Sequence, residues 1–285
     1  MMGFLSDLAQ YHFLWLAFLT SLFVGLLSGT LSPIIVSRKI EYISDGVAHA
    51  TFAGVAFSFL IGVSALPIAV LAALLFAFAV SVFSRRQRAS ENVMIGIFLP
   101  LFMALGVLFV SLAKGYVPDM MGFLFGNILL ISETDLWFLA IVWVTVTCFV
   151  ALFFREIQFY AFDEGMAKHY GVPVAFIHYV TLLCLSLSVV ASVKIAGVIL
   201  VNAFLITPGV TARFVAKSFA QMIGYAVLLS LFACFFGLYL GYRLDAPPGT
   251  TMVFTLFGEF LLFYLLGLKK PTTRGDRKSE QKSER

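Results

Sequence analysis

Long apolar stretches, separated by short polar or glycine- and proline-containing segments, run through the chain from end to end. Most of them approach the roughly 20 residues that a helix needs to cross the hydrocarbon core of a membrane. One stretch, Ile195–Pro208, is shorter, so we expect a half-helix or a tilted continuation of its neighbour. The pattern predicts an all-α membrane bundle of eight or nine transmembrane helices. The stretches are Phe13–Val36, Gly46–Val63, Leu66–Phe83, Val93–Leu112, Leu136–Phe154, Val174–Val193, Ile195–Pro208, Phe219–Tyr242 and Thr250–Leu268.

The composition agrees with a polytopic membrane protein. Of the 285 residues, 61% are hydrophobic and 12% are charged, and the mean hydropathy is +1.00, which is far from the balance of a soluble domain. The formal net charge of +4 is carried entirely by residues 269–285. We therefore predict a membrane domain over residues 1–268 and a basic, disordered cytoplasmic tail over residues 269–285, with no role in nucleic-acid binding.

The positions of the basic residues predict the orientation. With nine spans and a cytoplasmic C-terminus, all but three of the 19 Lys and Arg residues lie on the cytoplasmic side, as expected for membrane proteins. The exceptions are Lys114, Lys194 and Arg243. Removing one span would reverse half of the loops and destroy this asymmetry, which favours nine spans over eight.

A carboxylate and an imidazole interrupt the second apolar stretch. Asp45 and His49 are four residues apart, so a helix brings them to one face, one turn apart. Ionisable residues inside a membrane span are costly and usually functional, and both side chains can bind a divalent transition metal. Two interpretations remain open, a pathway for a cation and a buried pair that holds two helices together.

Two later spans carry further polar residues. Glu259 lies near the middle of the last stretch, where it could relay protons or metal ions or could pair within the bundle. Asn202 and Thr207 precede Pro208 in the short stretch, where a broken helix could line a cavity.

The internal loop over residues 155–178 predicts a short amphipathic helix. Asp163 and Glu164 lie at its start, Lys168 lies near its end, and Gly171 and Pro173 end it. Such a helix is a candidate docking surface inside the cell, and an ordinary connecting helix is the alternative. His178, which follows this loop, is expected at the surface or at an interface.

Several enzyme motifs are missing from the sequence. It contains no Walker A pattern, no HExxH or GxSxG motif and no cluster of Cys and His residues. We predict no catalytic residue, no permanently bound cofactor and no ATP hydrolysis by this chain.

Four stretches, taken in order, resemble segments of the permease subunits of the ABC-3 family of metal-ion importers, which carry zinc, manganese or iron. They are RKIEYISDGVAHATFAGVAF, LAKGYVPDMMGFLFGNILLIS, FDEGMAKHYGV and KIAGVILVNAFLITPGVTARF, and PPGTTMVF extends the resemblance towards the C-terminus. Two departures are Ser44, where the family often has Gly, and Glu259, where it usually has an apolar residue.

The resemblance implies a homodimeric permease in the cytoplasmic (inner) membrane of a prokaryote, with two cytoplasmic ATPase subunits and an extracytoplasmic metal-binding protein as partners. Asp45 and His49 match the family's intramembrane metal pair. The coupling of the ATPase falls on Asp163, Glu164 and Gly171.

The resulting hypothesis is ATP-driven import of a divalent transition-metal ion, with Zn²⁺ favoured over Mn²⁺ and Fe²⁺. Two alternatives come from other functional classes. A proton-coupled secondary metal transporter would use Asp45, His49 and Glu259 as relays, and a membrane scaffold without transport activity would tolerate loss of both ligands.

Overall fold

The structure, a computed structural model, describes residues 7–8, 10–87, 89–113 and 131–268, and the helices are the only regular elements in this part of the chain. Nine helical segments of the described chain are long and apolar enough to cross a membrane, two of them contributed by α10. The predicted all-α membrane bundle is confirmed. The helices are α2 (His12–Arg38), α3 (Ile43–Ile61), α4 (Ala65–Gln87), α5 (Glu91–Leu112), α7 (Glu133–Leu152), α8 (Phe154–Phe162), α9 (Glu164–His169), α10 (Val174–Arg213), α11 (Phe219–Leu244) and α12 (Pro248–Leu268).

A kink divides α10 into its two membrane-length segments, Val174–Val193 and Ala196–Arg213. The kink lies at Gly197, whose φ of 76° and ψ of 162° fall in a region that is open to glycine and closed to most other residues. The short predicted stretch is therefore a tilted continuation of its neighbour. It continues past Pro208 to Arg213, which gives it the length that the apolar pattern alone did not show.

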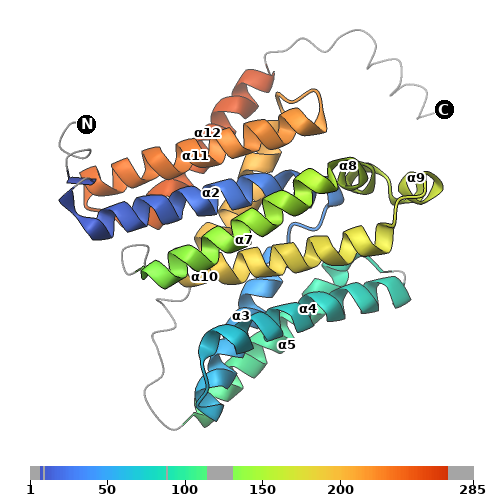
Figure 1. Cartoon of the computed structure of the whole chain (residues 1–285), viewed down its shortest axis with the longest axis horizontal. Coiled ribbons are helices and arrows are strands. Elements are labelled where there is room, and N and C mark those ends of the chain that lie inside the picture. Colours follow the sequence, from blue (N-terminus) through green and yellow to red (C-terminus); the bar gives the residue numbers. More distant parts are fainter. Residues whose placement is uncertain (1–6, 9, 88, 114–130, 269–285) are drawn as a thin grey trace.

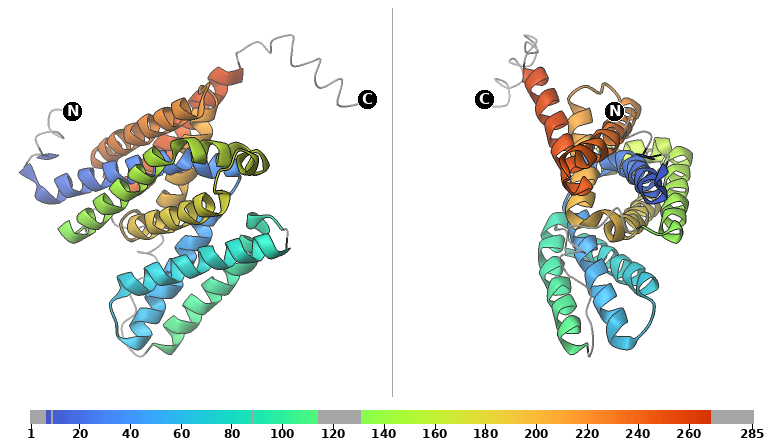
Figure 2. Two further views of the ribbon diagram at one scale, coloured as in Figure 1. Left: turned by 45° about the vertical axis from the view of Figure 1, so that its right-hand side comes forward. Right: turned by 90° about the vertical axis from the view of Figure 1, so that its left-hand side faces the viewer.

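The long helices form two units (Figures 1 and 2). The three-helix unit consists of α3, α4 and α5, and the main bundle consists of α2, α7, α10, α11 and α12. Glycines allow close helix contact within each unit. A Cβ atom on Gly54 of α3 would lie 2.8 Å from the Ile68 carbonyl oxygen of α4, and one on Gly29 of α2 would lie 2.7 Å from the Val227 Cα atom of α11.

The short helices α8 and α9 lie at one end of the molecule, beside the end of α4 in Figure 1. The predicted amphipathic helix corresponds to α9, and its boundaries arise as expected. The Asp163 carboxylate caps it by accepting a hydrogen bond from the Met166 backbone nitrogen at 2.9 Å, and Gly171, with φ of 77°, follows its C-cap residue, Tyr170. The predicted tail, residues 269–285, and most of the stretch LAKGYVPDMMGFLFGNILLIS lie outside the described residues.

Candidate functional site

Asp45 and His49 lie on one face of α3, as their spacing predicts. The His49 Nε2 atom is 3.5 Å from the Asp45 Oδ1 atom. Asn202, from the second segment of α10, donates a hydrogen bond from its side-chain nitrogen to the same Oδ1 atom at 3.0 Å. The Asp45 side chain is 37% exposed and that of His49 is 18% exposed. The contact between Asp45 and Asn202 therefore joins the three-helix unit to the main bundle at a partly open position.

This group offers a metal ion three kinds of donor atom. They are the carboxylate of Asp45, the imidazole of His49 and the amide oxygen of Asn202, which has no hydrogen-bond partner among the described residues. Closed structural sites for transition metals usually need four protein ligands. The described part of the chain contains no group of three or more His, Cys, Asp or Glu residues that could hold a metal ion. A single chain thus presents a partial, open set of ligands.

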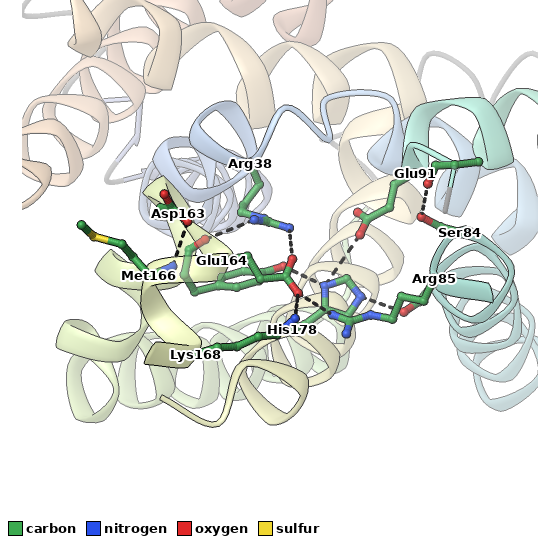
Figure 3. Close-up of polar contacts among 12 residues, drawn as sticks. Arg38, Ser84, Arg85, Glu91, Asp163, Glu164, Met166, Lys168 and His178 are labelled. Carbon is green, nitrogen blue, oxygen red and sulfur yellow. Dashed lines mark hydrogen bonds and ion pairs between the residues drawn. The ribbon is translucent and has the colours of Figure 1, made fainter. Parts of the chain in front are cut away.

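Glu164, the first residue of α9, points inward and contacts three cationic side chains (Figure 3). Its Oε2 atom is 3.2 Å from a terminal nitrogen of Arg38, at the end of α2. Its Oε1 atom is 3.2 Å from the Lys168 ammonium nitrogen and 3.8 Å from a terminal nitrogen of Arg85, in the last turn of α4. Burial alone would raise the pKa of the Glu164 carboxyl, but the hydrogen bond from Lys168 and the three positive charges hold it below its ordinary value.

His178 was expected at the surface or at an interface, and because it is completely buried, a position at the surface is wrong. Its Nε2 atom is 2.7 Å from the Ser81 hydroxyl oxygen and its Nδ1 atom is 2.7 Å from the Tyr160 hydroxyl oxygen. The Glu91 carboxylate lies 3.7 Å from Nδ1. Burial of His178 could have been predicted from the sequence, because this residue falls inside the apolar stretch that begins at Val174.

Arg38 connects the ion pairs to this buried group. It donates a hydrogen bond to the Tyr160 carbonyl oxygen at 3.2 Å, and its guanidinium lies 4.2 Å from the centre of the Tyr160 ring. Burial raises the pKa of the Tyr160 hydroxyl above its ordinary value, so this group stays neutral and can donate or accept a hydrogen bond. These pairings could not be predicted from local sequence patterns, since Arg38 and Glu164 are 126 positions apart.

The remaining predicted site residues lie elsewhere. Glu259 of α12 is only 9% exposed, and its Oε1 atom has no hydrogen-bond partner in the described chain. Within the same residues it forms no ion pair with His49, which lies beside Asp45. Asp163 is exposed, and Gly171 borders a cavity of about 430 Å³ beside Arg155 and Tyr170. The structure therefore brings Asn202, and not Glu259, to the Asp45 and His49 pair.

Comparisons with known proteins agree with the fold of the chain. The model of the ABC 3 transport family matches residues 10–267. The "Probable metal transport system membrane protein" of Thermotoga maritima is 43% identical over 260 residues, which cover 91% of this chain and 92% of that protein. The "Manganese transport system membrane protein MntC" of Listeria monocytogenes is 34% identical over 94% of this chain and 96% of its own. The solved structure of PsaBC from Streptococcus pneumoniae in complex with Fab contains a chain with a TM-score of 0.82 and 32% identity, covering 93% of this chain and 95% of that chain.

Proposed function

We propose, from the premise that this chain belongs to the ABC 3 transport family, that it is the membrane permease of an ATP-driven importer of a divalent transition-metal ion. Its relatives include metal transport membrane proteins that match it over nearly their whole length. Family membership favours this function over a proton-coupled secondary transporter and over a scaffold. ATP hydrolysis belongs to a partner subunit in such a transporter, which agrees with a chain that carries no Walker A pattern.

The observation that carries the proposal is the contact of Asp45 with His49 and Asn202. A pathway must bind an ion well enough to admit it and weakly enough to release it. Two partly exposed donor groups on α3, with the buried amide oxygen of Asn202 on α10 as a third, suit this requirement better than a closed four-ligand site. We assign the transported ion to these three residues.

The exposed fraction of Asp45 supports assembly with a second copy of the chain. A carboxylate that is 37% exposed on a membrane-spanning helix is costly against lipid, so another protein surface or water must cover it. A two-fold axis beside α3 would place the same group of the second copy opposite the first, and the dimer could briefly offer a complete ligand set. The proposed permease is therefore a homodimer.

We place Mn²⁺ ahead of the zinc that the sequence favoured. Among the donor atoms, two are oxygens, one is an imidazole nitrogen and none is a thiolate, and carboxylate and carbonyl oxygens suit manganese. The name of the Listeria relative points the same way. Zinc and iron are the alternative transported ions.

The segment from Asp163 to Gly171, here called the coupling segment, provides the docking surface for the ATPase. Asp163 caps the start of α9, Gly171 follows its C-cap residue, and a cavity lies beside Gly171 at the same end of the molecule. In the proposed orientation this end and the C-terminus face the cytoplasm, and an extracytoplasmic metal-binding protein delivers the ion on the other side of the cytoplasmic membrane.

The test is manganese accumulation in proteoliposomes that contain the chain and its ATPase, supplied with the delivery protein. We expect accumulation only with hydrolysable ATP, and we expect Asp45→Asn and His49→Ala to abolish it. His12→Ala is the matched control, because His12 is an exposed histidine at the start of another span. ATP-independent accumulation, or normal accumulation by both ligand variants, would refute the proposal.

A further inference from the structure

Glu164 lies where the two helical units meet. Through Arg38 it contacts the end of α2 in the main bundle, and through Arg85 it contacts the end of α4 in the three-helix unit (Figure 3). Each guanidinium faces a different oxygen of the same carboxylate. The Glu164 side chain is 30% exposed and that of Arg38 is 17% exposed. This carboxylate is therefore directed into the protein, although it belongs to the short helix that is assigned to ATPase docking.

The charges around Glu164 make its carboxylate necessary for this arrangement. Arg38, Arg85 and Lys168 all lie within 4 Å of it, so its removal would leave three positive charges gathered around one position. Partly buried charges are screened less by salt than exposed ones, and charge-assisted hydrogen bonds are the stronger kind. The carboxylate thus holds the ends of α2 and α4 against α9.

Arg38 and the proposed metal ligand Asp45 are only seven residues apart in the sequence. Arg38 ends α2, Lys39 follows in the left-handed conformation with φ of 57°, and Asp45 lies in the first turn of α3. The intervening link is fixed to α5, because the Asn92 side chain donates a hydrogen bond to the Lys39 carbonyl oxygen at 3.0 Å. A displacement of Arg38 is therefore carried directly to the start of the helix that bears Asp45.

The hydrogen bond between Asn202 and Asp45 and the ion pairs of Glu164 both connect the three-helix unit to the main bundle. The Asp45 and Asn202 hydrogen bond joins α3 to α10, and the Glu164 ion pairs join α4 to α9 and α2. A relative movement of the two units at one contact must change the geometry of the other, since helices transmit displacements as nearly rigid bodies. The ion pairs of Glu164 and the contact between Asp45 and Asn202 therefore change together when the three-helix unit moves relative to the main bundle.

We propose that Glu164, with Arg38 and Arg85, forms a coupling latch, in which Glu164 is a positioning residue that transmits the movement of α9 to the two helical units. This inference rests on the proposed function and refines it, because it removes Glu164 from the ATPase contact and gives it an internal role. The latch is closed in this structure. Displacement of α9 by the ATPase separates the carboxylate from one guanidinium, loosens the contact between the two units at this end, and alters the contact between Asp45 and Asn202.

The test measures three quantities on the reconstituted importer, which are co-purification of the ATPase, the rate of ATP hydrolysis and the number of manganese ions transported per ATP. Glu164→Gln keeps the size of the side chain and removes its charge. We expect co-purification and hydrolysis to persist, and the transported ions per ATP to fall about fivefold or more, the lower end of typical coupling effects. Asp245→Asn is the control, since Asp245, directly after α11, is exposed and forms no ion pair in the described chain, and we expect no change in that ratio.

Two further variants separate the latch from a merely structural role. Glu164→Asp keeps the charge and should recover most of the ratio. Arg38→Met combined with Glu164→Gln should be no worse than the more affected single variant, because both act on one contact. A fully additive loss in the double variant would overturn the latch.

The remaining outcomes are equally distinct. Loss of ATPase co-purification in Glu164→Gln would make this residue a docking contact and overturn the latch, as would an unchanged ratio of ions to ATP. Failure of the wild-type importer to move manganese with ATP would instead refute the proposed function, and the latch with it.

Discussion

Replacement of His178 by Phe tests the buried polar group at the coupling end of the molecule. His178 is fully buried and both of its ring nitrogens lie 2.7 Å from hydroxyl oxygens, those of Ser81 and Tyr160. Phe has a similar size, so the change removes the two hydrogen bonds without leaving a large cavity. The two hydroxyl groups then remain in the interior without their partner.

The expected loss of stability follows from the two stranded groups. Each buried polar group without a partner costs about 1–3 kcal/mol, so the variant should lose about 2–6 kcal/mol. At roughly 2–4 °C per kcal/mol for chains of this order of size, the unfolding temperature should fall by about 5–20 °C. The measurement is thermal unfolding of the purified permease in detergent at one fixed heating rate, because unfolding in detergent is often irreversible.

Two controls make the result specific. His169→Phe applies the same substitution to an exposed histidine of α9 and should leave the unfolding temperature nearly unchanged. Combining His178→Phe with Ser81→Ala and Tyr160→Phe removes all three polar groups, so this triple variant should recover much of the loss. A His178→Phe variant that unfolds at the wild-type temperature would refute the reasoning.

Three further predictions concern the fold and the latch. Gly197→Ala should destabilise the protein by about 1–3 kcal/mol, because alanine is strained at φ of 76° and ψ of 162°. Gly224→Ala is the control and should be neutral or slightly stabilising, because a Cβ atom at this helical position meets open space. Equal unfolding temperatures for the two variants would contradict this prediction. Gly29→Leu should sharply reduce the yield of folded, monodisperse protein in size-exclusion chromatography, since its Cβ atom would lie 2.7 Å from the Val227 Cα atom of α11, and a normal yield would show that the two helices can separate. The pKa of the Glu164 carboxyl in the folded protein lies below its ordinary value of 4.5, so its contribution to stability is complete above pH 4.5 and is lost as the pH falls through the folded-state pKa. The difference in unfolding temperature between the wild type and Glu164→Gln should therefore stay constant down to about pH 5 and then shrink. A difference that grows in acid would reverse the assigned sign.

The helices were predictable because each apolar stretch is a local property of the sequence. The spans, the short helix at Asp163 and its end at Gly171 all depend on residues within a few positions of one another. The predicted short stretch ends at Pro208, whereas α10 continues to Arg213, and no hydrophobic pattern reveals the kink at Gly197 that divides this helix.

The candidate site was predictable only in part. Asp45 and His49 share a helix face because their spacing requires it, but the position of Asn202 depends on how α10 packs against α3, 157 residues away in sequence. The partners of Glu164 could not be predicted for the same reason, because they depend on how distant helices pack. The sequence shows Arg38 and Arg85 only as basic residues near the ends of spans. Burial of His178 could have been expected, because an apolar stretch surrounds it on both sides.

The central claim is that the transported ion binds Asp45, His49 and Asn202, and pulsed electron paramagnetic resonance of Mn²⁺ in the assembled importer tests it most directly. We predict a nitrogen coupling from an imidazole ligand in the wild type, the same coupling in His12→Ala, and its loss in His49→Ala. Nitrogen coupling that persists in His49→Ala, or a wild-type importer whose bound manganese shows none, would contradict the claim.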